Sequence, residues 1–82
     1  MNMIHYEKRK VFSFPKSKHE EVQFAVRNWK GKPYASIQVY HIADDGARES
    51  TEKEFFIAAE KLPDFKEGIE QLISAIEKVK AE

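Results

Sequence analysis

The residues best suited to chemistry lie in the run Arg27-Asn28-Trp29-Lys30-Gly31-Lys32. A tryptophan between cationic side chains is typical of surfaces that bind single-stranded nucleic acid, because bases stack on the indole ring while phosphates meet the cations. A structural alternative is open, since an aromatic residue beside a turn can cover a sheet edge and lysines are often solvated surface charges. The element that carries this run therefore decides what Trp29 can reach.

A β-hairpin is the element that must position these residues. Gly31 can supply the positive φ of a two-residue loop at Lys30-Gly31, so we expect residues 20–28 and 33–42 to pair as antiparallel strands. One face then carries polar and aromatic side chains, in the pairs Trp29–Lys32, Arg27–Tyr34, Ala25–Ser36 and Gln23–Gln38. The other carries apolar side chains, in the pairs Val26–Ala35, Phe24–Ile37 and Val22–Val39. A slip of one residue would mix the two faces, so the alternation supports this register.

No pattern points to catalysis or to a cofactor. The sequence has no nucleophile motif, phosphate-binding loop or zinc-ligand spacing. His5, His19 and His41 lack the spacing of metal ligands, and Asp44-Asp45-Gly46 predicts a turn. We therefore expect neither an enzyme nor a bound metal or cofactor.

The charge of the chain is balanced overall but uneven along its length. The 82 residues include 14 basic and 14 acidic side chains, yet residues 1–40 hold eight Lys/Arg against three Asp/Glu, and residues 41–82 hold six against eleven. A basic sheet face beside an acidic helix would give this pattern, as would a surface that simply mixes charges. The chain has no cysteine and no apolar run that could span a membrane, so we expect a cytoplasmic protein without membrane contact. A domain this small and without disulfides often gains stability by oligomerising.

The remaining segments predict two further strands around the hairpin. We expect residues 1–10 to form an N-terminal arm, residues 11–14 a short strand with Phe12 and Phe14 inward, and residues 15–18 a turn or loop. Residues 50–57 return as the fourth strand, but apolar side chains occur at both parities there, so its core face is less well determined.

The C-terminal third predicts one helix over about residues 62–80. Apolar side chains recur at helical spacing: Phe65, Ile69, Leu72, Ile73, Ile76 and Val79. Asp64 followed by Glu67 reads as a capping signature, and Pro63 suits the helix entry. The fold class is therefore α+β, with a four-stranded antiparallel sheet followed by one C-terminal helix (ββββα). We expect residues 11–80 to form this single domain, with the helix over one sheet face and the polar-aromatic face open.

The sequence resembles the single-stranded-DNA-binding domain of the PC4/p15 transcriptional coactivator family, which has small bacterial homologues. The resemblance covers about residues 11–79 and rests on the run from Arg27 to Lys32, a strand ending at Tyr40, the turn at residues 44–46 and the C-terminal helix. It implies a homodimer whose two sheets form curved channels for single strands. It also implies that Trp29 stacks on a base, and that Lys30 and Lys32 contact phosphate.

The chain departs from the family pattern at three places. Gln38 stands where the family commonly has an arginine, His41 where it has a second stacking tryptophan, and Glu52-Lys53-Glu54 where it has a basic run. Fewer cations and one stacking platform fewer lead us to expect micromolar rather than nanomolar affinity.

These observations together predict a homodimeric protein that binds single-stranded DNA, with RNA as the other possible ligand. The process would be transcription regulation or DNA maintenance. The candidate nucleic-acid-binding residues are Arg27, Trp29, Lys30, Lys32, Tyr34, Gln38, Tyr40, His41, Arg48 and Lys53. The alternative is a homodimeric protein-interaction module on the same scaffold, with an eroded nucleic-acid channel.

Overall fold

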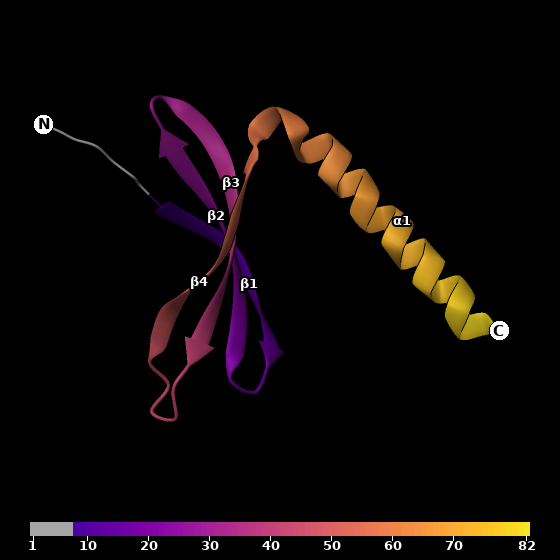
Figure 1. The fold of residues 1–82 in the computed structure, drawn as a ribbon, viewed down its shortest axis with the longest axis horizontal. Coiled ribbons are helices and arrows are strands. Elements are labelled where there is room, and N and C mark those ends of the chain that lie inside the picture. Colours follow the sequence, from indigo (N-terminus) through magenta and orange to yellow (C-terminus); the bar gives the residue numbers. More distant parts are fainter. Residues whose placement is uncertain (1–7) are drawn as a thin grey trace, which may run out of the picture.

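The computed structural model describes residues 8–82. It holds a four-stranded sheet in the order β1-β2-β3-β4, each strand antiparallel to the next, followed by a short 3-10 turn and one helix (Figure 1). The elements are β1 (Lys8–Ser17), β2 (Glu20–Trp29), β3 (Lys32–Ile42), β4 (Arg48–Ala58), η1 (Ala59–Lys61) and α1 (Leu62–Ala81). The predicted ββββα arrangement is confirmed.

The hairpin between β2 and β3 has the predicted register, with Trp29 opposite Lys32 and Val22 opposite Val39. Lys30 and Gly31 both have positive φ, at 51° and 78°, as a two-residue type I′ turn requires. The turn therefore fixes which side chains of β2 and β3 share a face.

Strand β1 is longer than expected. It begins at Lys8, inside the expected arm, and continues through Pro15 to Ser17, so the turn lies at Lys18 and His19 instead of at residues 15–18. Pairing with β2 survives two register irregularities, one of them between Pro15 and Ser17. A proline is tolerated here because β1 is an edge strand, where a missing N–H need not break the ladder. Residues 1–7 of the expected arm lie outside the described residues.

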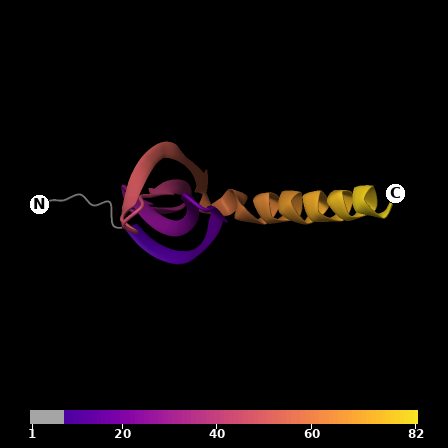
Figure 2. The same ribbon diagram turned by 90° about the horizontal axis from the view of Figure 1, so that it is seen from below.

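In most sheets with one solvated face the apolar face is buried and the polar face is exposed, and this sheet shows the reverse. The polar side is the more buried one: Ser36 is 1% exposed and Gln38 5%, beside Ala25, Gln23 and Glu21. Figure 2 shows that the sheet is strongly curved, and the burial of its polar side indicates that this is the hollow side. We call this side, which carries the hairpin's polar pairs, the concave face.

The opposite side is the convex face, where Val22 is buried but Phe12, Phe14, Val26 and Phe55 are open to solvent. Its residues include Phe12, Phe14, Val22, Phe24, Val26, Ile37, Val39 and Phe55. The rings of Phe12 and Phe14 lie near that of Phe24, at 5.9 and 6.1 Å between centroids. Even so, Phe12 is 60% exposed, so the expected inward position of these rings is wrong for a single chain.

The expectation that the helix covers the sheet is also wrong for a single chain. Figure 1 shows α1 running away from the sheet, and no residue of α1 is buried. Only the N-terminal part of α1 reaches the convex face. There the ring of Phe65 lies edge-on to the ring of Phe55, with 6.0 Å between the ring centroids. Sequence periodicity shows that a helix has an apolar side, but not what covers that side. Among residues 8–82, no helix combines the length and apolarity needed to cross a membrane.

The start of α1 differs from the expected capping signature. The N-cap position is Lys61, without a side-chain cap, while Pro63 lies in the first turn as expected. Because η1 leads directly into the helix, the chain is already helical before Asp64. Asp64 therefore lies inside the first turn, where its carboxylate interacts favourably with the helix dipole.

Candidate nucleic-acid interface

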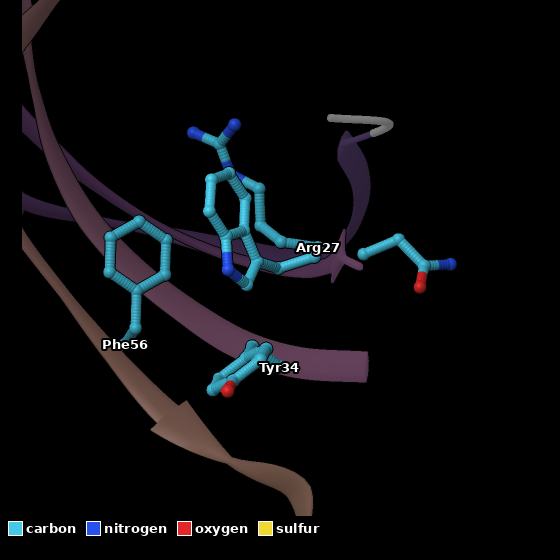
Figure 3. A pocket seen from close by; sticks show the side chains of 5 residues that line it. Arg27, Tyr34 and Phe56 are labelled. Carbon is cyan, nitrogen blue, oxygen red and sulfur yellow. The ribbon is translucent and has the colours of Figure 1, made fainter. Parts of the chain in front are cut away.

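One end of the concave face holds an aromatic pocket. Its volume is about 460 Å³, within the range of small-molecule sites. Its lining residues are Arg27, Asn28, Trp29, Tyr34 and Phe56. Figure 3 shows Arg27, Tyr34 and Phe56 reaching it from β2, β3 and β4 respectively. The hairpin register brings these groups together, because Arg27 lies opposite Tyr34 and Ser36 lies opposite Phe56.

Cations accompany the aromatic rings of this pocket. The guanidinium carbon of Arg27 lies 5.9 Å from the centroid of the Phe56 ring, and Nζ of Lys30 lies 5.6 Å from that of Trp29. Trp29 is 46% exposed, so part of its ring faces solvent. A flat ring beside a cation is the combination on which bases stack while phosphate is neutralised. Lys32, opposite Trp29, adds a second exposed cation at this end.

Phe56 was not among the candidate residues. Its parity in β4 matches that of Glu54, so it was expected on the other side from Phe55, and the structure places it there. Five consecutive apolar residues, Phe55 to Ala59, left open which of them faces the polar side. The pairing of β4 with β3 was the missing information.

An ion pair holds Arg27 beside the pocket. Its Nη2 donates to Oε2 of Glu54 at 3.0 Å, and the hydroxyl of Ser36 donates to the same oxygen at 2.6 Å. Both charged side chains are largely buried, with 23% of Arg27 and 17% of Glu54 exposed. The Nε atom of Arg27 is buried without a hydrogen-bond partner among residues 8–82. Arg27 is thus held in place by Glu54, and because Nε is buried, the donors left are the two of Nη1 and the second of Nη2.

The far end of the concave face holds a second compensated cation. Nε of Arg48 donates to Oε1 of Glu21 at 3.1 Å, and the Gln23 amide donates to the same oxygen at 2.9 Å. These bonds hold the pKa of Glu21 below its ordinary value, with the Arg48 hydrogen bond as the largest cause. The same bond raises the pKa of Arg48.

Gln38 lies between the two ends, and Tyr40 lies at the far end, opposite Glu21. Nε2 of Gln38 donates to the backbone oxygen of Thr51 at 3.1 Å, while its Oε1 is buried without a partner among the described residues. The ammonium of Lys8 donates to the hydroxyl of Tyr40 and lies 4.4 Å from its ring centroid. Lys8 therefore occupies one side of the ring on which a base would have to stack.

Two candidate residues lie on the other face. His41 follows Tyr40 in β3 and therefore points to the convex side, where it stacks on His19 at 6.3 Å between centroids. Lys53 shares the parity of Phe55, and its Nζ lies 3.7 Å from a carboxylate oxygen of Glu20. The structure separates these two residues from the pocket because successive side chains of a strand alternate between faces.

The sheet places the other eight candidate residues on one side of the molecule. On the concave face or in its turn lie Arg27, Trp29, Lys30, Lys32, Tyr34, Gln38, Tyr40 and Arg48. Within residues 8–82, no three His, Asp or Glu side chains are grouped so that they could hold a metal ion. The arrangement is suited to stacking and hydrogen bonding on a curved, partly charge-compensated surface.

Comparisons of the chain with known protein families, with curated proteins and with solved structures found no match.

Proposed function

We propose that this protein binds single-stranded nucleic acid, DNA in preference to RNA, along the concave face of its sheet. The observation that carries the proposal is the pocket that Trp29, Tyr34 and Phe56 line together with Arg27, whose guanidinium lies beside the Phe56 ring. We further propose that it acts as a PC4-like cytoplasmic protein in transcription regulation or DNA maintenance.

The physical support is the combination of rings, cations and curvature. A base stacked on an aromatic side chain contributes about 1–3 kcal/mol, and every base has a flat face to offer. Lys30 and Lys32 are exposed at the hairpin turn, where the phosphates of a strand entering the pocket could reach them. A duplex hides its bases from such a pocket, which favours a single strand.

We also propose that the protein is a homodimer. The exposed apolar side chains of the helix and of the convex face are Phe12, Phe14, Val26, Phe55, Leu62, Ile69, Leu72, Ile73, Ile76 and Val79. An open apolar surface of this extent is unusual for a monomer, and stable dimers bury surfaces of this kind. A second copy offers the matching surface, because its own helix and convex face are equally uncovered.

The test is a titration with an oligothymidylate of about twelve nucleotides, a length that spans typical single-strand sites. We expect quenching of Trp29, a micromolar Kd and weaker binding as salt rises, because bound phosphates release counterions. By anisotropy of a labelled oligonucleotide, Trp29→Ala should weaken binding about tenfold or more. Lys30→Ala and Lys32→Ala should each lower the salt slope by about 0.7, the value for one single-strand phosphate.

Lys66→Ala in α1 is the matched control, since it removes the same charge at a distance from the concave face. It should leave both the affinity and the salt slope unchanged. Unchanged tryptophan fluorescence together with no mobility shift at low salt would refute nucleic-acid binding.

A protein-interaction module is the second candidate function, and one observation favours it. Glu54 and Glu21 already neutralise Arg27 and Arg48 on the face that would meet phosphate. In this case the protein would form its dimer but bind no oligonucleotide at low salt. The titration above therefore separates the two candidates.

A further inference from the structure

We propose that the aromatic pocket is a guanine-selective base site, with Arg27 as the group that reads the base. The inference rests on the proposed single-strand binding and adds a preference that stacking alone does not give. It starts from Arg27, which lines the pocket together with three aromatic side chains and forms an ion pair with Glu54.

The ion pair with Glu54 favours a neutral ligand over phosphate. The 3.0 Å bond between Nη2 of Arg27 and Oε2 of Glu54 balances the arginine's charge at the pocket wall. A phosphate next to this pair would be repelled by the carboxylate, whereas an uncharged base would not. Lys30 and Lys32 are better suited to bind phosphate, because neither the turn at residues 30–31 nor the residues next to it include Asp or Glu.

The geometry of a guanidinium then selects among bases. Arg27 has five N–H donors in a planar fork, but Nε is buried and Nη2 already donates one hydrogen bond to Glu54. The two N–H groups of Nη1 and the second N–H of Nη2 are therefore the donors left for a base. A fork needs two adjacent acceptors, which guanine offers at O6 and N7, while adenine and thymine place a donor beside each comparable acceptor. Cytosine offers N3 and O2 in a single strand, but a purine covers more of the surrounding aromatic surface.

Glu54 is a positioning residue in this scheme. Its Oε2 accepts from Arg27 and from the hydroxyl of Ser36 at 2.6 Å, so the carboxylate is held from both β2 and β3. It keeps the guanidinium directed across the pocket and keeps the local charge near zero. Loss of its charge should make the site less selective and more attractive to phosphate.

The experiment compares oligothymidylates of about twelve nucleotides that carry one central guanine, adenine, cytosine or 7-deazaguanine. We expect the guanine strand to bind about tenfold more tightly than the adenine or thymine strands, and 7-deazaguanine to lose most of that gain because it lacks N7. Arg27→Lys should abolish the preference while keeping the charge. Lys30→Ala is the control, since it should weaken binding to all strands alike.

Glu54→Gln adds a readout that a merely structural role would not change. It should raise affinity for plain oligothymidylate while lowering the guanine preference. Equal binding of all strands, or a preference for cytosine, overturns guanine selection and leaves single-strand binding intact. If no strand binds, the proposed function fails as well. The 7-deazaguanine comparison uses the unaltered protein, so it decides the matter even where circular dichroism shows that a variant is unfolded.

Discussion

Arginine in place of Ile73 is expected to split the proposed dimer. Ile73 lies in the middle of α1 and is 52% exposed in the single chain. Full burial of an isoleucine side chain contributes about 1.5–3 kcal/mol, so covering the open half contributes roughly 1 kcal/mol. In a two-fold symmetric dimer the same residue is replaced in both copies, so the loss of burial energy occurs twice. The loss is therefore about 2 kcal/mol, or about 30-fold in Kd, before the cost of burying a charge is added.

Sedimentation velocity at micromolar concentration measures the effect. The unaltered protein should sediment with a mass of about 19 kDa, twice the 9.6 kDa of one chain. The Ile73→Arg protein should approach the mass of one chain. Ser74→Arg is the matched control, because it adds the same charge one residue on, at a position outside the apolar stripe of α1.

Two results would refute this reasoning. One is a monomer mass for the unaltered protein. The other is equal dimer stability for the Ile73 and Ser74 variants, which would mean that the apolar side of α1 is not in the interface. Circular dichroism of each variant checks that the helix itself is intact.

Three further outcomes are expected. Because Arg48 holds the pKa of Glu21 below 4.5, this pair should stabilise the fold above that pH and lose its contribution as the pH falls through the lowered pKa. Urea midpoints between neutral and acid pH should show the loss, and Arg48→Met should reduce it, leaving the smaller effect of the Gln23 hydrogen bond; an unchanged pH profile in the variant would contradict the assignment. Lys30→Asn should raise the unfolding free energy by up to about 1 kcal/mol, because asparagine tolerates the positive φ better than lysine. Gly31→Ala should lower it by roughly 1–2 kcal/mol through its positive φ alone, since no atom lies within 4 Å of an added Cβ; a neutral effect in thermal unfolding would argue against the type I′ turn.

The hairpin and its face assignment were predictable from the sequence because two signals agreed. The Lys30-Gly31 turn fixed the register, and strict alternation in both strands allowed only that register. The same alternation already placed His41 on the side of Val39, opposite Tyr40. Its inclusion in the candidate site came from the family resemblance, and the parity of the strand was the better guide.

Other features depend on contacts that a single sequence does not encode locally. Phe56 joined the pocket through the register between β3 and β4. The turn predicted at residues 44–46 did not fix this register, because the pairing shifts between Gln38 and Tyr40. Curvature buried Ser36 and Gln38, although alternation alone would leave polar residues open to solvent. Helical periodicity predicted α1 but not its direction, which follows from η1 at its start.

The concave and convex faces are two sides of a single layer of backbone. Along β4, Phe55 points to the proposed interface, while its neighbours Glu54 and Phe56 belong to the proposed base site. A shift that tightens the packing of Phe55 in a dimer would thus move the groups that hold and flank Arg27. By thermodynamic linkage, an oligonucleotide that binds the dimer better than the monomer must strengthen dimerisation by the same factor. Dimerisation and oligonucleotide binding would then be coupled equilibria. The dissociation constant of the dimer would fall as the pocket fills, so it would report how much of the protein has oligonucleotide bound.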